Sequence, residues 1–355
     1  MRILAVNPGS TSTKVALFED ETQLFELTLR HTAEELSRYG SVLDQFEFRK
    51  EIILDALREA AVDVLSLDAV IGRGGVVRPV RSGVYAVNET LLHDLRHSPM
   101  GAHASNLGGL IADEIARLAG AGAFIADPVV VDELQPVARV TGIPQIERRS
   151  IFHALNQKAI ARQYAGKQGR KYEDMNLIVA HLGGGISVGA HRRGEVVDVN
   201  NALNGDGPFS PERAGSLPAQ QLADLCFSGE YTAGQIRKML CGEGGMVALL
   251  GTNDMREAIQ RMEAGDRQAQ SVIDAMCYNV AKWIGAMAAV LCGEVDAILL
   301  TGGIAHNGCI CRAIEAQVSF LAPVAVMPGE NELEALALNA LRAIKGEIET
   351  REYNP

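Results

Sequence analysis

A polar loop near the N-terminus carries residue types that bind phosphate. The segment Asn7-Pro-Gly-Ser-Thr-Ser-Thr-Lys14 offers an amide, hydroxyls and an ammonium group, and short apolar runs, 3–6 and 15–18, flank it. The runs predict the two strands of a β-hairpin, because Pro and Gly between them are typical of a turn. Backbone N–H groups and hydroxyls of such a loop can bind a phosphate, although an ordinary polar turn explains the loop as well. The candidate phosphate ligands are Asn7, Ser10, Ser12 and Lys14.

The same arrangement recurs in the second half of the chain. His181-Leu-Gly-Gly-Gly185 lies between the apolar runs 177–180 and 186–190, and a further strand and helices are predicted after both hairpins. Adjacent glycines let the backbone approach nucleotide phosphates closely. The repeat predicts two related α/β domains, each with a hairpin loop, over residues 1–150 and 151–330.

Two arginines, an aspartate and a histidine stand where they could act on a transferred phosphoryl group. Phosphoryl transfer needs cations and a divalent metal ion around the phosphate more than it needs reacting groups. Arg73 follows a predicted strand and is flanked by glycines, and Arg213 lies in a predicted loop. Asp127 ends another strand, where its carboxylate could hold Mg²⁺ through water, and His153 begins a helix. A surface Arg, an Asp-Pro turn and a structural His are the alternatives from these residues alone.

The composition limits the function classes. With 355 residues, 47% of them hydrophobic and 22% charged, the chain is typical of a soluble globular protein of two domains. A net charge of −11 argues against nucleic acid or an anionic membrane as the main partner. The most apolar long segment, 280–300, contains Lys282, Glu294 and Asp296, so it predicts no membrane span. Six irregularly spaced cysteines and the lack of a visible signal peptide predict free thiols in the cytoplasm.

Apolar periodicity predicts the remaining elements. The predicted strands are 24–29, 69–71, 84–87, 123–126, 195–199, 297–300 and 324–326. The predicted helices are 33–59 (one or two helices), 89–95, 102–118, 152–164, 219–227, 232–240, 254–263, 267–292 and 332–348.

The loop 7–14 resembles the opening of the butyrate kinases, a branch of the acetokinase family of carboxylate kinases, and further similarities extend along nearly the whole chain. The family belongs to the superfamily of actin, the sugar kinases and Hsp70. The resemblance therefore implies an α/β fold of two duplicated ribonuclease-H-like domains with an active-site cleft between them. It also implies that the C-terminal segment, 331–355, packs on the first domain, and that the chain forms a homodimer or a larger homo-oligomer.

The activity that the resemblance implies is reversible, ATP-dependent phosphorylation of butanoate to butanoyl phosphate, with ATP or ADP and Mg²⁺ as cofactors. The resemblance assigns catalytic roles to Arg73, Asp127, His153 and Arg213. It assigns nucleotide binding to His181, Gly183, Gly184, Gly185, Asp254, Arg256, Gly302, Gly303, His306 and Asn307. Asp127 and Glu332 would hold the metal ion, although a carboxylate at a helix N-terminus is also favoured by the helix dipole.

The chain departs from the family pattern at three places. Acetate kinases usually carry valines where this chain has Gly74 and Gly75, so we expect these glycines, with Phe152, to leave room for an acyl chain longer than acetate. Met255 stands where the family usually has a Phe that contacts the nucleotide. The Phe-His pair that usually follows the residue matching Asp127 is missing.

Two alternatives to a butyrate kinase remain. One is an acetate, propionate or isobutyrate kinase of the same family. The other is a nucleotide-switched binding protein or filament former of the Hsp70 and actin kind. Arg73, His153 and Arg213 argue against the switch, because a nucleotide switch does not require them, and we expect no appended peptide-binding domain.

Overall fold

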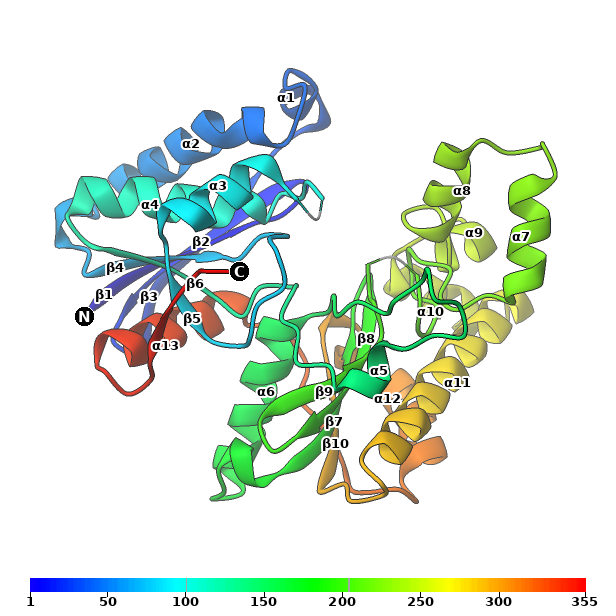
Figure 1. The fold of residues 1–355 in the computed structure, drawn as a ribbon. Coiled ribbons are helices and arrows are strands. Elements are labelled where there is room, and N and C mark those ends of the chain that lie inside the picture. Colours follow the sequence, from blue (N-terminus) through cyan, green and yellow to red (C-terminus); the bar gives the residue numbers. More distant parts are fainter. Residues whose placement is uncertain (100, 204) are drawn as a thin grey trace. The chain divides into compact units, whose positions relative to one another are not determined.

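The computed structural model describes residues 1–99, 101–203 and 205–355, which divide into two compact units (Figure 1). The first unit comprises residues 1–132 and 331–355, and the second comprises 133–330. The segment 133–150 therefore belongs to the second unit, whereas the sequence analysis placed it in the first domain. Local bonds explain the difference, since Gln135 N–H donates to the carbonyl of Val197 at 3.0 Å and Arg148 pairs with Asp198 at 2.8 Å.

The described part of the first unit is built on a seven-stranded sheet in the order β12-β5-β6-β4-β1-β2-β3. β1 to β3 form an antiparallel meander, and β1, β4 and β6 run parallel. The strands are β1 (Arg2–Pro8), β2 (Ser12–Glu19), β3 (Thr22–Arg30), β4 (Ala69–Arg73), β5 (Val84–Ala86), β6 (Gly122–Ala126) and β12 (Thr350–Glu352).

Helices cover both faces of this sheet (Figure 1). Leu4 and Val6 of β1 point into a core with Ile53, Leu57 and Leu107, so α2 and α4 lie on one face, and α13 covers the other. The helices are α1 (Ala33–Ser37), α2 (Phe46–Glu59), α3 (Glu89–His97), α4 (Asn106–Ala119) and α13 (Glu332–Ile344), with 3-10 turns η1 (Leu43–Gln45) and η2 (Val64–Ser66).

The described part of the second unit holds a five-stranded sheet in the order β11-β10-β7-β8-β9. Its strands are β7 (Asn176–Leu182), β8 (Ile186–Arg192), β9 (Glu195–Val199), β10 (Ala297–Thr301) and β11 (Val324–Val326). Its helices are α5 (Pro136–Arg139), α6 (Ala154–Lys167), α7 (Ala219–Phe227), α8 (Ala233–Leu240), α9 (Met246–Leu250), α10 (Met255–Glu263), α11 (Arg267–Val290) and α12 (Gly308–Val318), with 3-10 turns η3 (Tyr172–Asp174) and η4 (Gly303–His306). The largest core packs α11 and α12 on β7, β8 and β10.

Each predicted strand and helix overlaps an observed one, including both hairpins. The sequence analysis did not identify α5, α9, α12 or β12, and the last helix ends at Ile344 rather than at residue 348. All six cysteines are free thiols, and no helix among the described residues combines the length and apolar character that crossing a bilayer requires.

Candidate active site

In the first unit, three neighbouring parallel strands carry polar side chains at their carboxyl ends. Asn7 lies near the end of β1, Arg73 ends β4, and Asp127 follows β6. β4 pairs in parallel with both β1 and β6, so these three ends lie at one edge of the sheet. Such an edge is where open α/β sheets usually bind ligands.

Glu332, the first residue of α13, holds two of these side chains in place. Its Oε2 accepts a hydrogen bond from Asn7 Nδ2 at 2.6 Å and another from Arg73 Nη1 at 2.9 Å. Glu332 and Asn7 are buried, whereas the Arg73 side chain is 19% exposed. The carboxylate therefore fixes the guanidinium while leaving part of it open to solvent. Lys14 lies opposite Asn7 in the hairpin register and is exposed.

The loop after β1 is fixed by a residue that the sequence analysis missed. Arg49 of α2 is 1% exposed and donates from Nη1 to the carbonyl oxygens of Gly9 at 2.7 Å and Ser12 at 3.2 Å. Its Nη2 donates to the carbonyl oxygen of Ser10 at 3.2 Å. Because carbonyl oxygens repel anions, turning three of them toward α2 favours binding of a phosphate by the loop. The available signal was a single Arg on the apolar side of helix 46–59.

Asp127 is buried and stands in an unusual backbone conformation. Its φ is +38°, a region that non-glycine residues seldom adopt. Its Oδ1 accepts from Ser82 Oγ at 2.6 Å and from the Gly83 N–H at 2.9 Å. These bonds explain how the strained turn is held, and they fix the carboxylate against the segment just before β5.

Gly74 and Gly75 do not leave the space that the sequence analysis expected. A Cβ on Gly75 would lie 2.7 Å from Asn106 Cα and 2.8 Å from Leu95 Cδ2, and one on Gly74 would lie 2.6 Å from Pro128 Cβ. All these neighbours belong to the first unit. The two glycines therefore let the chain after β4 pack closely on α4 and on the turn after β6, rather than opening room for an acyl chain.

In the second unit, two histidines stack at the edge of the sheet. His181 is the last residue but one of β7 and is 1% exposed, and His153 stands at the N-cap position of α6 after the buried Phe152. Their rings lie 3.7 Å apart with an interplanar angle of 9°. His153 Nδ1 lies 2.8 Å from Ser187 Oγ, and His181 Nδ1 lies 2.7 Å from Asn156 Oδ1. The structure thus brings together two histidines that the sequence analysis assigned to separate roles.

The guanidinium of Arg213 packs against the glycine turn between β7 and β8. A Cβ on Gly185 would lie 1.3 Å from Arg213 Nη1, so any side chain there would displace the guanidinium from this position. Nε and Nη1 of Arg213 are buried and have no hydrogen-bond partner among the described residues. Burying donors without partners is costly, so these two nitrogens are available to bind a ligand. Ser210 Oγ donates to the carbonyl of Gly184 at 2.7 Å and ties the Arg213 loop to the turn.

A cavity of about 700 Å³ opens beside this turn within the second unit. It is lined by seven residues that the sequence analysis predicted to bind nucleotide: Gly183, Gly184, Asp254, Arg256, Gly303, His306 and Asn307. The remaining lining residues are Pro211, Asn253, Met255, Ile259, Ile304 and Glu330. A lining that combines glycine backbone, charged groups and apolar side chains suits a phosphorylated ligand with an apolar ring system.

Several residues that were predicted to bind nucleotide also have structural roles. Asp254 caps α10 and forms an ion pair with Arg256 at 2.8 Å, and its hydrogen bonds with Arg256 lower the pKa of its carboxyl to about 2. Asn307 caps α12 by accepting from two backbone N–H groups. Gly302 has a φ of +89°, and a Cβ there would lie 2.4 Å from the Leu182 carbonyl oxygen. His181, Gly185 and Gly302 do not line the cavity.

Comparisons with known proteins settle the family. Residues 142–334 match the model of the Acetokinase family. A probable butyrate kinase of Phocaeicola vulgatus is 57% identical over 355 residues, which cover 100% of both chains. The chain belongs to the acetokinase family. Butyrate kinase 1 of Clostridium acetobutylicum is 53% identical over 352 residues, 99% of each chain.

The fold is that of the acetokinase family. The crystal structure of Porphyromonas gingivalis acetate kinase superposes with a TM-score of 0.77 at 19% identity and covers 94% of this chain and 97% of that one. The expected actin-like α/β fold is therefore confirmed, and so is the family resemblance inferred from the loop 7–14.

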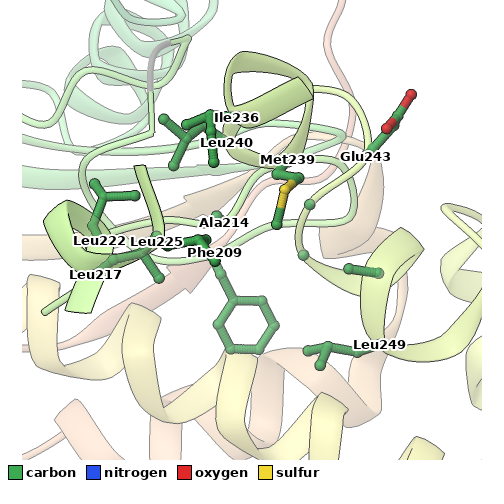
Figure 2. A pocket seen from close by; sticks show the side chains of 13 residues that line it. Phe209, Ala214, Leu217, Leu222, Leu225, Ile236, Met239, Leu240, Glu243 and Leu249 are labelled. Atoms are coloured by element: carbon green, nitrogen blue, oxygen red, sulfur yellow. The ribbon is translucent and has the colours of Figure 1, made fainter. Parts of the chain in front are cut away.

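A second, apolar cavity of about 290 Å³ lies behind the Arg213 loop (Figure 2). Side chains from α7, α8 and α9 surround it, and Glu243 is the one charged residue that lines it. Its apolar lining residues are Phe209, Ala214, Leu217, Leu222, Leu225, Ile236, Met239, Leu240, Ala248 and Leu249. None of the side chains of α7 is buried, so this helix packs loosely on the apolar cavity that Leu222 and Leu225 line.

Proposed function

We propose that this chain is a butyrate kinase, which transfers the γ-phosphoryl group of ATP to butanoate and gives butanoyl phosphate and ADP in a reversible reaction. The choice of butanoate as the substrate is supported by identity above 50% to two proteins named as butyrate kinases, over nearly the whole length of both chains. The enzyme is thus a phosphotransferase with a carboxyl group as acceptor.

The cavity beside the glycine turn is the proposed site of the adenine nucleotide. Gly184 would offer its backbone N–H to the phosphates, while the Gly183 N–H donates to the Gly185 carbonyl at 3.2 Å and holds the turn. Ile259, Ile304 and His306 would contact the adenosine. Met255, at the position of the usual Phe, is mostly buried under this wall and supplies apolar contact without an aromatic stack.

Two arginines are proposed to neutralise the charge of the transferred phosphoryl group. Arg213 carries two buried N–H donors that lack partners, which supports a role in holding phosphate oxygens. Arg73 is oriented by Glu332 and Asn7, and a planar guanidinium suits a carboxylate or a phosphoryl group. The ionised carboxylate of the substrate attacks directly, so the reaction requires no general base. His153 and Asp127 are the further proposed catalytic residues.

Mg²⁺ is the proposed metal cofactor, and the donors of the first unit fit it. No group of three or more His, Cys, Asp and Glu in the described chain could hold a metal ion by itself. Kinases typically bind Mg²⁺ through one or two carboxylates together with nucleotide phosphates. Asn7 and Arg73 both donate to Oε2 of Glu332, so Oε1 can face a water of a hydrated ion, and Asp127 is the second candidate. Bound there, the ion would neutralise phosphate charge.

We also propose that the enzyme acts in the cytoplasm as a homodimer or larger homo-oligomer, with no nucleic-acid or membrane partner. Free thiols at all six cysteines suit a reducing compartment, and the net charge of −11 disfavours nucleic acid and anionic lipid.

Trapping of the product tests the proposed reaction. The enzyme is incubated with Mg-ATP, butanoate and hydroxylamine, which converts an acyl phosphate to a hydroxamate. We expect one butanoyl hydroxamate per ADP formed. Release of ADP without hydroxamate, at the same rate with and without acid, would contradict the proposal and favour a nucleotide switch.

A further inference from the structure

A chain of hydrogen-bonded side chains, called the positioning chain below, connects Tyr172 to His153 inside the second unit. Tyr172 Oη lies 2.7 Å from His191 Nδ1, and His191 Nε2 lies 2.9 Å from Gln157 Oε1. Gln157 Nε2 lies 2.8 Å from Ser187 Oγ, and that oxygen lies 2.8 Å from His153 Nδ1. Gln157, Ser187 and His191 are each 0% exposed, so water does not compete for these bonds.

One carbonyl group determines which groups donate and which accept along the positioning chain. Gln157 Nε2 also donates to the backbone oxygen of Ser187 at 3.0 Å, and a carbonyl oxygen can only accept. This bond identifies the amide nitrogen of Gln157, so its oxygen faces His191. His191 Nε2 must therefore carry a proton that it donates to Gln157 Oε1.

The same reasoning gives the donor and the acceptor in the hydrogen bond between Ser187 and His153. Ser187 Oγ accepts from Gln157 Nε2, and the backbone N–H of His153 also points at it from 3.5 Å. The hydroxyl proton of Ser187 is then left for His153 Nδ1, which accepts. A neutral imidazole has a single N–H, so the proton of His153 stands on Nε2.

The other end of the chain agrees with this direction. Burial lowers the pKa of His191 well below its usual value, and the charges of Lys158 and Arg162 lower it further. A neutral His191 with its proton on Nε2 accepts at Nδ1, where Tyr172 donates. Gly189 makes room for the chain, because a Cβ there would lie 2.6 Å from Gln157 Oε1.

We infer that Ser187, Gln157 and His191 are positioning residues that hold His153 as the neutral imidazole protonated at Nε2. The inference rests on the proposed function in one respect, that His153 serves the transferred phosphoryl group. His153 then donates an N–H to a phosphoryl oxygen and does not take a proton from the substrate. The ring of His181 stacks on that of His153 with 3.7 Å between the centroids, and His181 Nε2 lies 3.4 Å from Glu330 Oε1, so His181 also fixes the orientation of the His153 ring.

The inference is tested by long-range ¹H–¹⁵N correlation spectra of the full-length, nucleotide-free protein with ¹⁵N-labelled histidine at pH 7.5. A His153→Asn spectrum assigns the His153 signals. We expect the wild-type protein to show His153 as the Nε2–H tautomer, and Ser187→Ala to shift at least half of it to the Nδ1–H tautomer. The same variant should lower kcat about tenfold with an unchanged KM for ATP, and Ser187→Thr should restore both readouts.

Tyr172→Phe is the matched control, since it also removes one hydroxyl from the chain but leaves Gln157 and His191 facing each other. Its His153 tautomer should equal that of the wild type. A wild-type His153 that is protonated at Nδ1 would overturn the inference, as would a Ser187→Ala variant that loses activity without a change of tautomer. If the tautomers behave as expected while no carboxylic acid is phosphorylated, the proposed function fails and the positioning chain stands.

Discussion

Arg73 and Glu332 are 259 positions apart in the chain, yet Arg73 Nη1 lies 2.9 Å from Glu332 Oε2. The C-terminal helix α13 thus brings a carboxylate to the ends of β1 and β4, and this carboxylate orients the partly exposed guanidinium of Arg73. Glu332 at the start of α13 and Arg73 at the end of β4 form this ion pair, and the buried amide of Asn7 contacts both.

Replacing this carboxylate should affect stability and activity together. Glu332→Gln leaves Arg73 without its anion in a mostly buried place, so we expect a loss of about 1–3 kcal/mol in the free energy of unfolding. We also expect kcat to fall more than about tenfold. Urea unfolding and steady-state kinetics measure the two effects. Glu347→Gln is the control, because its pair with Arg342 at 3.7 Å is exposed and should contribute less than about 0.5 kcal/mol.

Removing Arg213 should separate activity from stability. The buried Nε and Nη1 of Arg213 have no partner in the described chain, so Arg213→Gln should leave the melting temperature unchanged or raise it. Loss of the guanidinium should lower kcat about a hundredfold or more. Arg237→Gln, on the exposed side of α8, should change neither quantity. A variant that melts much earlier would show that Arg213 is structural.

Gly75→Val should damage the fold rather than change the substrate preference. The new side chain would collide with Asn106 and Leu95, and overpacking of this kind costs about 1–3 kcal/mol or more. The ratio of kcat/KM for butanoate to that for acetate should stay as in the wild type. Gly166→Ala, where no atom lies within 4 Å of the added Cβ, is the matched control and should be neutral or slightly stabilising. A variant of Gly75 that is stable and prefers acetate would contradict the packing explanation.

The ion pair of Asp94 with Arg78 should make stability depend on acid pH. Arg78 donates to Asp94 at 2.7 Å and 2.9 Å, and this contact, with the hydroxyl of Tyr353, lowers the pKa of Asp94 from 3.8 to about 2. Because the pKa is lower in the folded chain, the stabilisation is complete above about pH 5 and is lost as the pH falls toward 2. It amounts to about 2 kcal/mol.

Unfolding of the wild type and of Asp94→Asn at pH 6 and at pH 2.5 measures this contribution. The difference in free energy of unfolding between the two proteins should shrink toward acid pH. A difference that is the same at both pH values would exclude the ion pair as its cause.

Local sequence signals predicted the elements and the polar turns well. Apolar runs of four or five residues marked the strands of both hairpins, and the polar or glycine-rich stretch between each pair marked the turn, because both signals depend on neighbours in the chain. Most residues predicted to bind nucleotide line one cavity, because they come from such turns and from helix starts.

The contacts between distant residues could not be predicted in this way. Nothing near Arg49 in the sequence shows that it binds the loop of residues 9–12, and nothing near Gly75 shows that Asn106 fills the adjacent space. The short strand β12 pairs in parallel with β5 through Thr350–Glu352, a segment with no strand pattern of its own. These features depend on which elements pack together, and that information is spread over the whole chain.

The preference among short-chain acids tests the central claim most directly. ADP formation with Mg-ATP would be measured against acetate, propionate, butanoate, isobutyrate and valerate, beside a blank without acid. We expect the highest kcat/KM for butanoate, with acetate at least about tenfold lower. A maximum at acetate or propionate would contradict the proposed substrate, and ATP hydrolysis that no acid stimulates would contradict the kinase itself.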